Sequence, residues 1–352
     1  MDYRKEIDEL VDLIIKEDAS DLHLSSGRTP IIRVAGSLIP LVKRPVITEK
    51  DMEGYMNIFL TPEGKDILKK VKDIDFSYNL THARFRGNVY YRQASPAIAL
   101  RLIPKTIRTL SELSLPPILE SFTRKSQGFF LCVGPIGQGK TTTLSTLIEM
   151  INQTRTEHIL TIEDPIEYLF ESKKSVIDQR EVRIDTPDFS DALTAMFRQD
   201  IDVCMVGEMR DTNTMATAVT AAETGHLVFS TLHTNNAAQT IDRIIDSFPS
   251  SQQDQIRVQL AGSLSAIFSQ RLIPRISGGL VPAYELLINN SAVSNLIRER
   301  RSHEINTVIE TSSQQGMIDM NRSLAELVRA GEISVENAYT YSMNPKSLER
   351  LI

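Results

Sequence analysis

The chain of 352 residues contains only two cysteines, and their surroundings argue against a disulfide framework. Cys132 and Cys204 each lie in a short apolar run, where a thiol packs as a small hydrophobic side chain. The sequence also has no cysteine cluster with metal-ligand spacing. These absences exclude a small disulfide-stabilised secreted domain and favour a reducing cytoplasm.

Long apolar runs and long basic runs are missing as well. No uninterrupted apolar stretch is long enough to cross a bilayer, so we expect no transmembrane segment. Residues 1–6 are charged and lack the apolar core of a secretion signal. The net charge of −6 argues against nucleic acid as a partner. The length and the 41% hydrophobic content fit an ordinary globular protein of two domains.

One stretch, residues 134–141, carries a specific chemical signal. It fits the phosphate-loop pattern G-x-x-x-x-G-K-[ST] at every fixed position, with an apolar run before it and helical spacing after it. Glycines let backbone N–H groups surround a phosphate, and the helix N-terminus adds partial positive charge. We expect Lys140 to reach the β- and γ-phosphates of ATP and Thr141 to ligate Mg²⁺. The expected binding set is Gly134, Pro135, Ile136, Gly137, Gln138, Gly139, Lys140, Thr141 and Thr142.

The pattern of strands and helices predicts two domains of different class. Residues 1–103 mix helical and alternating segments and predict a compact α+β domain, and the proline-containing residues 104–118 are interpreted as a linker. In residues 119–352, strands and helices alternate from residue 129, which predicts a mostly parallel α/β sheet covered on both faces. From about residue 250 to residue 268 the apolar spacing is interpreted as helical.

Acidic residues follow two predicted strands of the second domain. Glu208 follows the apolar run 203–206 and one glycine, so we expect it to be the general base for hydrolysis. Glu163 and Asp164 stand at the end of strand 158–162, where we expect them to hold Mg²⁺ through water, with Glu163 also counted as catalytic. A single glutamate in such a position is more often an ordinary solvated residue. Several candidates around one phosphate loop favour the catalytic interpretation.

Basic residues supply further candidates. His226 and His233 bracket the apolar run 227–232, and either is a candidate sensor of the γ-phosphate, although a structural histidine is the ordinary alternative. Arg84, Arg86 and Arg101 lie on predicted strands of the first domain, where a solvated sheet face is the ordinary alternative. Their more specific interpretation is that they act as arginine fingers across a subunit boundary.

These residues give the chain a resemblance that covers nearly its whole length. It resembles the PilT-type ATPases, which are retraction motors of type IV pili in the secretion-ATPase superfamily. The matching stretches are residues 19–25 (the opening of a PAS-like domain), 134–141 (Walker A), 161–168 (Asp box), 206–211 (atypical Walker B) and 225–235 (His box).

The resemblance implies an architecture and a set of partners. It implies an N-terminal PAS-like α+β domain followed by a RecA-like P-loop ATPase domain with a helical C-terminal part. It implies a homohexameric ring in which each N-terminal domain packs on the next subunit's ATPase domain, which gives Arg84, Arg86 and Arg101 their role in trans. The implied partner is the inner-membrane platform protein of the pilus, with peripheral attachment at the inner face of the cytoplasmic membrane.

Three departures from the family pattern bear on direction and chemistry. Gln138 stands where the family usually has serine, and Thr141 replaces a common serine. Residues 292–295 read Ala-Val-Ser-Asn instead of Ala-Ile-Arg-Asn, which concerns retraction and not ATP hydrolysis. The four-cysteine metal site of the extension ATPases is absent, which favours retraction. Alternatives are a pilus assembly or type II secretion ATPase, a nucleotide-binding regulatory ring with little hydrolysis, and a DNA translocase.

Overall fold

The computed structural model describes residues 2–34, 36–80, 83–103 and 106–352. The chain divides into two compact units, Met1–Thr106 and Ile107–Ile352, which are described separately below. Within the described ranges, no helix combines the length and the apolar character that a membrane span requires.

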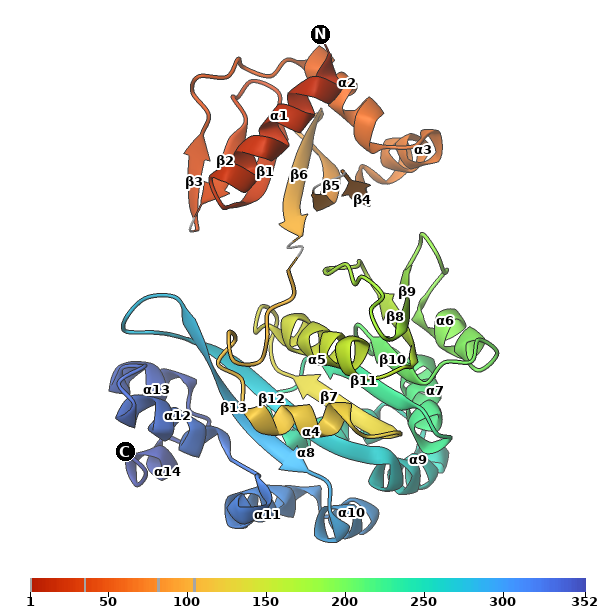
Figure 1. Cartoon of the computed structure of the whole chain (residues 1–352), viewed down its shortest axis with the longest axis vertical. Coiled ribbons are helices and arrows are strands. Elements are labelled where there is room, and N and C mark those ends of the chain that lie inside the picture. Colours follow the sequence, from red (N-terminus) through yellow and green to blue (C-terminus); the bar gives the residue numbers. More distant parts are fainter. Residues whose placement is uncertain (1, 35, 81–82, 104–105) are drawn as a thin grey trace. The chain divides into compact units, whose positions relative to one another are not determined.

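The first unit is an antiparallel sheet with helices packed on it (Figure 1). Its helices are α1 (Tyr3–Lys16), α2 (Glu49–Phe59) and α3 (Pro62–Val71). Its strands are β1 (Ala19–Ser25), β2 (Ile31–Val34), β3 (Ser37–Pro40), β4 (Asp73–Asn79), β5 (Arg84–Arg92) and β6 (Ser95–Ile103). They pair in the order β3-β2-β1-β6-β5-β4.

The core of the first unit lies between this sheet and α1 and α2. Helix α1 begins after Asp2, whose side chain accepts a hydrogen bond from the Lys5 N–H. Its apolar residues recur at i, i+3, i+4 and i+7, which places Ile7, Leu10, Val11 and Ile14 in one buried stripe. Inward-facing residues of β1, β5 and β6 complete this cluster.

The second unit is an α/β sheet in the order β13-β12-β7-β11-β10-β8-β9. All neighbouring strands pair in parallel except β12 and β13. The strands are β7 (Gly128–Val133), β8 (His158–Glu163), β9 (Val176–Glu181), β10 (Val203–Val206), β11 (Leu227–Leu232), β12 (Leu264–Pro274) and β13 (Leu280–Ile288). The α-helices around them are α4 (Glu120–Thr123), α5 (Lys140–Thr154), α6 (Phe189–Met196), α7 (Thr212–Glu223), α8 (Ala237–Asp246) and α9 (Ser250–Ser263).

Helices beyond the sheet make up most of the C-terminal part. They are α10 (Ser291–Arg298), α11 (Ile305–Thr311), α12 (Met320–Arg329), α13 (Val335–Tyr341) and α14 (Pro345–Glu349). Short 3-10 turns lie at Pro117–Leu119, Ser302–Glu304 and Ser313–Gln315. Helices α12 to α14 cover part of the β12–β13 hairpin through a small apolar cluster of their own.

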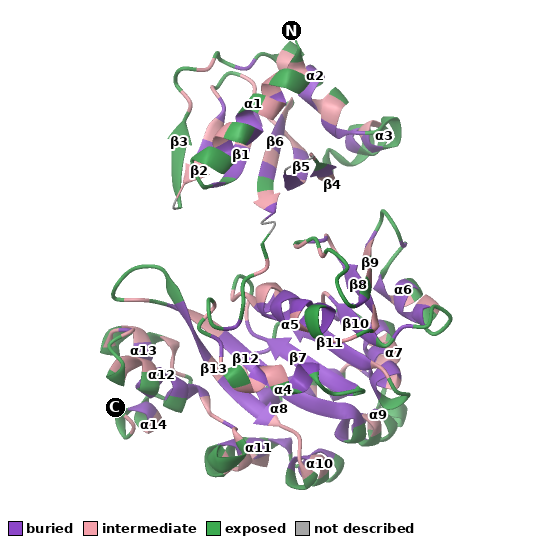
Figure 2. Ribbon diagram, viewed as in Figure 1, coloured by how far each residue is buried: buried purple, intermediate pink, exposed green. Residues whose placement is uncertain are grey.

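Strand β7 shows how the sheet is buried on both faces. Its residues Phe129, Leu131 and Val133 join the apolar cluster formed with α6 to α11. Phe130 and Cys132 point the other way, into the cluster formed with α5 and residues 110–122. The run of buried residues along the central strands is visible in Figure 2. A strand covered on both faces reads as a continuous apolar run, as this one does.

Three segments differ from the interpretation made on the sequence. Residues 264–268 begin strand β12 and do not continue helix α9, which ends at Ser263. Strand β9 was not predicted. In the proposed linker, residues 104 and 105 lie outside the described residues, and the segment from Ile107 onward belongs to the second unit. The physical reason is that Leu110 and Leu115 are buried in the cluster that contains α5.

Candidate nucleotide-binding site

The phosphate-loop residues connect the end of β7 with the start of α5. Gly137 and Gly139 have φ values of +77° and +75°, a left-handed conformation that favours glycine. A Cβ atom on Gly137 would meet no heavy atom within 4 Å, and the neighbouring Ile136 is 83% exposed. The rim of the loop is therefore open. Helix α5 begins at Lys140 without a side-chain cap, so its first N–H groups are available to an anion.

Lys140 is buried beneath this loop. Its Nζ donates hydrogen bonds of 2.8 Å to the carbonyl oxygens of Gly134 and Pro135. It also lies 3.3 Å from Nδ1 of His233, which follows the end of β11. Burial lowers the pKa of Lys140, whereas the nearby carboxylate of Glu208 acts in the opposite direction. The ammonium group is thus held at the centre of the site by groups from two strand ends.

Glu208 continues this chain of contacts. Its Oε2 lies 3.4 Å from Nε2 of His233, and its Oε1 accepts a 2.5 Å hydrogen bond from Nη2 of Arg210. The imidazole therefore bridges Lys140 and Glu208. Burial alone would raise the pKa of Glu208, but the contacts with Arg210 and His233 outweigh it and hold that pKa below its usual value. Glu208 is consequently an ionised carboxylate at neutral pH, as a general base must be.

Glu163 occupies a different environment at the end of the neighbouring strand. Its Oε1 accepts hydrogen bonds from Thr161 Oγ1 (2.6 Å) and Gln179 Nε2 (3.1 Å). Burial raises its pKa to about 7 against the effect of these bonds. Asp164, the next residue, pairs with Arg183 at 2.9 Å. The two strand-end carboxylates thus point to different partners.

The residues at this edge fit a Mg²⁺ ion, which prefers hard oxygen ligands and keeps much of its water shell. Thr141 follows Lys140 directly, Glu163 is the last residue of β8, and Glu208 follows the adjacent strand β10. Across the described ranges, no group of three or more histidine, cysteine or acidic residues forms a ready metal cage. The available donors therefore suit an ion held mainly by phosphates and one hydroxyl group. Asp164 fits this role less well because Arg183 holds its carboxylate.

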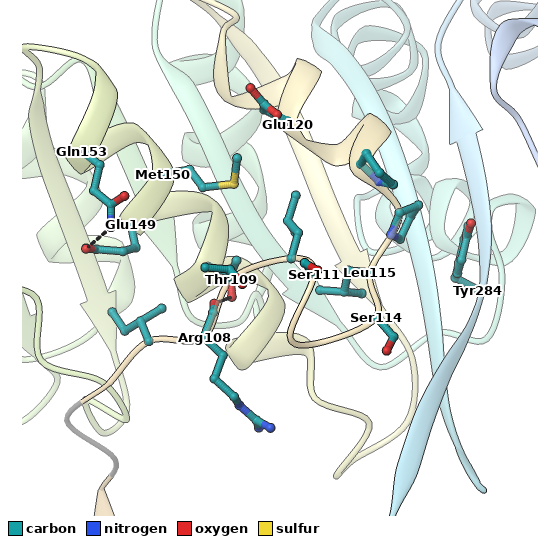
Figure 3. A pocket seen from close by; sticks show the side chains of 15 residues that line it. Arg108, Thr109, Ser111, Ser114, Leu115, Glu120, Glu149, Met150, Gln153 and Tyr284 are labelled. Atoms are coloured by element: carbon teal, nitrogen blue, oxygen red, sulfur yellow. Dashed lines mark hydrogen bonds between the residues drawn. The ribbon is translucent and has the colours of Figure 1, made fainter. Parts of the chain in front are cut away.

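Two hollows border helix α5, and they differ in chemistry. The smaller one, about 360 Å³, is lined by Gly139 and Thr142 together with apolar residues such as Leu113 and Leu272. Thr142 also lies 2.9 Å from the hydroxyl of Tyr168. The larger hollow, about 720 Å³, lies between residues 107–120 and the flank of α5 (Figure 3). Its described lining includes no residue of 134–142, so of these two hollows it is the smaller one that contacts the phosphate loop.

His226 is separated from the other candidates. It precedes β11, whereas His233 follows it, and a strand of this length spans about 20 Å. The His226 ring lies 3.1 Å from the carbonyl oxygen of Ala221 and packs edge-on against Phe197. The structure therefore does not bring it to the phosphate loop of its own subunit. Within one subunit, the structure therefore gives no support to the predicted role of His226 as a sensor of the γ-phosphate.

The three candidate arginines share one face of the sheet in the first unit. Arg86 and Arg101 are directly opposite each other on β5 and β6, and Arg84 precedes Arg86 by two residues. Nε of Arg101 donates a 2.8 Å hydrogen bond to Asp21, which pairs with it from β1. Arg84 is largely buried, and its Nη2 lies 3.4 Å from Ser77 Oγ. Asp21 thus offsets part of the repulsion between like charges.

Sequence reasoning assigned no role to two residues that contact the site. Arg210 binds Glu208, and Tyr168 contacts Thr142. Both lie inside stretches already singled out, 206–211 and 161–168. The Tyr168 contact depends on how two separate segments fold together, whereas Arg210 lies only two residues after Glu208 and was passed over as part of the matched stretch.

Comparison with known proteins places this site in a family. The model of the family described as type II/IV secretion system protein matches residues 3–303. The chain belongs to this family. It is 40% identical over 343 residues to the type IV pilus retraction ATPase PilT of Pseudomonas aeruginosa, a match that covers 97% of this chain and 99% of that protein.

Two further relatives agree with this assignment to the type II/IV secretion system family. The chain is 43% identical over 322 residues to a twitching motility protein of Neisseria gonorrhoeae, covering 91% of this chain and 86% of that protein. It is similar to the crystal structure of the pilus retraction motor PilT with bound ADP, with a TM-score of 0.91, 44% identity, and coverage of 97% and 98% of the two chains. That neighbour binds nucleotide in the same fold.

Proposed function

We propose that this chain is an ATPase whose hydrolysis of ATP drives the retraction of type IV pili. One observation carries the proposal: the contacts from Lys140 through His233 to Glu208 stand beside a phosphate loop, in a chain similar to retraction ATPases over nearly its whole length. A cation, an imidazole and an ionised carboxylate in that order suit hydrolysis of a phosphoanhydride bond.

Each group has a defined task in this proposal. The loop N–H groups and Lys140 bind the phosphates of ATP, and the hollow beside Thr142 receives the base and sugar. Glu208 accepts a proton from the attacking water, and His233, within reach of both Lys140 and Glu208, orients toward the γ-phosphate. Bound Mg²⁺ supplies positive charge to the phosphate oxygens. The Thr141 hydroxyl is the protein group placed to hold that ion.

The proposal extends to assembly. We place a PAS-like first unit and a RecA-like second unit in a homohexameric ring in which Arg84, Arg86 and Arg101 act on a neighbour's nucleotide. The common face of Arg86 and Arg101 supports this role, because two neighbouring guanidinium groups suit phosphate oxygens, whereas the largely buried Arg84 is less accessible. The ring would work against the platform protein at the inner face of the cytoplasmic membrane. Arg101 would have to exchange its bond with Asp21 for one with phosphate.

Two measurements test the function and separate it from its alternatives. Purified protein should release phosphate from ATP in the presence of Mg²⁺, and a binding-only regulatory ring would not. The gene should restore twitching in a strain that lacks its retraction ATPase and should fail to restore surface pili in a strain that lacks its assembly ATPase. The opposite pattern of complementation would identify an assembly or secretion motor. Turnover that requires DNA would identify a translocase.

A further inference from the structure

Strand β12 extends past its neighbour β7 and reaches the phosphate loop. The last paired residues are Ser269 and Val133, but β12 continues to Pro274. Beyond Ser269, strand β12 has no further partner residue in β7, and its residues Gln270 and Leu272 contact the phosphate loop instead. The Leu272 N–H donates a 2.7 Å hydrogen bond to Oε1 of Gln138. The side chain of Gln138 therefore satisfies a backbone N–H of β12 that has no partner in β7.

Gln270 connects the loop to helix α5. It is only 3% exposed, and both ends of its amide are engaged. Nε2 donates a 2.7 Å hydrogen bond to the backbone oxygen of Gln138, and Oε1 accepts a 2.7 Å bond from Oγ1 of Thr143. Because the Gln138 carbonyl can only accept, it fixes Nε2 as the end of the amide that faces the loop, and the Thr143 hydroxyl holds the other end as donor to Oε1.

This bond sets the direction of a peptide group in the loop. In a trans peptide the N–H points away from the preceding carbonyl. With the Gln138 oxygen turned toward Gln270, the N–H of Gly139 points away from β12. An N–H turned in this way is available to a phosphate.

The loop backbone also lies directly against Gln270. A Cβ atom on Gly134 would lie 2.4 Å from the Gln270 carbonyl oxygen, and one on Gly139 would lie 3.0 Å from Gln270 Nε2. These two glycines therefore allow the backbone of Gln270 to approach the start of the loop and its side chain to approach the end.

We propose that Gln270 is a positioning residue for nucleotide binding, which holds the phosphate loop in its binding conformation through Gln138 and Thr143. The inference deepens the proposed function and rests on ATP being the ligand. A preorganised loop loses less conformational freedom when the phosphate binds, so removal of the support weakens binding. The chemical step at Glu208 is not touched, so turnover at saturating ATP is preserved.

A pair of threonine variants tests this role with little change in shape. Thr143→Val removes the hydroxyl that anchors Oε1 of Gln270, and Thr143→Ser retains it. Thr154→Val is the matched control, because its hydroxyl bonds a carbonyl of its own helix at the far end of α5. Gln270→Met removes both amide contacts at similar volume. Titration with a fluorescent ADP measures affinity, steady-state phosphate release measures KM and kcat, and thermal unfolding checks that each variant is folded.

Thr143→Val and Gln270→Met should bind ADP about fivefold to tenfold more weakly and raise KM for ATP to a similar extent. Their kcat, and all parameters of Thr143→Ser and Thr154→Val, should stay within about twofold of wild type. If Gln270→Met does not fold, the Thr143 pair decides. Unchanged affinity in Thr143→Val, or a loss of kcat at unchanged KM, would overturn the positioning role. Wild-type protein that fails to bind ADP would instead count against the proposed function.

Discussion

Replacing Glu208 by glutamine separates nucleotide binding from hydrolysis. Glutamine has nearly the same size and retains an oxygen that can accept the bond from Arg210, so the local geometry should survive. It lacks the negative charge and cannot accept the proton of the attacking water. We expect turnover to fall about 10²-fold to 10⁴-fold, the usual contribution of a positioned base. This loss corresponds to about 3 to 5 kcal/mol in the activation barrier.

The pH dependence of the wild-type protein gives a second readout of the same role. A base acts in its deprotonated form, and the contacts with Arg210 and His233 keep the pKa of Glu208 below its usual value. The acid limb of kcat should therefore lie well below neutral pH. The pKa of Glu163 is about 7, so catalysis by Glu163 would instead place that limb near neutrality.

The assay is phosphate release at saturating ATP and Mg²⁺, with fluorescent ADP binding measured on the same samples. Glu223→Gln is the matched control, because Glu223 is exposed on α7 and contacts Gln259. Lys140→Ala supplies the opposite phenotype, since it removes the buried cation and should abolish tight binding. If Glu208→Gln keeps turnover within about tenfold of wild type, or loses nucleotide affinity as Lys140→Ala does, the assignment of Glu208 as the base is wrong.

Three further predictions address assembly, stability and coupling. An Arg101→Ala variant mixed with the Glu208→Gln variant should regain turnover that neither has alone, because a mixed interface can combine an intact arginine with an intact glutamate. A mixture that stays inactive argues against action in trans. Burial raises the pKa of Glu285 to about 7, so the folded protein binds an extra proton below that pH and loses stability as pH rises towards it. The stability of Glu285→Gln relative to wild type, measured by urea unfolding, should thus improve by about 3 kcal/mol from about pH 5 to about pH 8, and a pH-independent difference would contradict this. Replacing Arg298 and Glu299 together by alanine should leave ATP turnover largely intact, because both side chains are exposed at the end of α10. The same double variant should abolish pilus retraction. Parallel loss of turnover would indicate a structural role.

Sequence patterns could predict the strands and helices that are marked by a local motif or by a clear change in residue type at their ends. The phosphate loop between an apolar run and a helical stretch is a local signal, and β7 and α5 lie where that signal places them. Residues 264–268 carried no such signal. They are buried on both faces of the sheet, so the apolar residues show no strand period, and β12 begins at Leu264 directly after helix α9.

Contacts between distant segments could not be predicted from spacing. Gln138 was expected to belong to the phosphate loop, but its partner Gln270 is 132 positions away and had no predicted role. The separation of His226 from His233 has a similar origin. Both flank the same apolar run, but a parallel sheet assembles its site at the carboxyl ends of the strands, so only the residue after β11 reaches it.

Time-lapse imaging of labelled pili tests most directly whether hydrolysis at Glu208 powers retraction. Cells that lack their own retraction ATPase would carry either the wild-type chain or the Glu208→Gln variant at matched expression. Pili should extend and then shorten in the first strain, and they should extend without shortening in the second. Shortening at equal rates in both strains, or no shortening in either, would contradict the claim that this chain is the ATP-driven retraction motor.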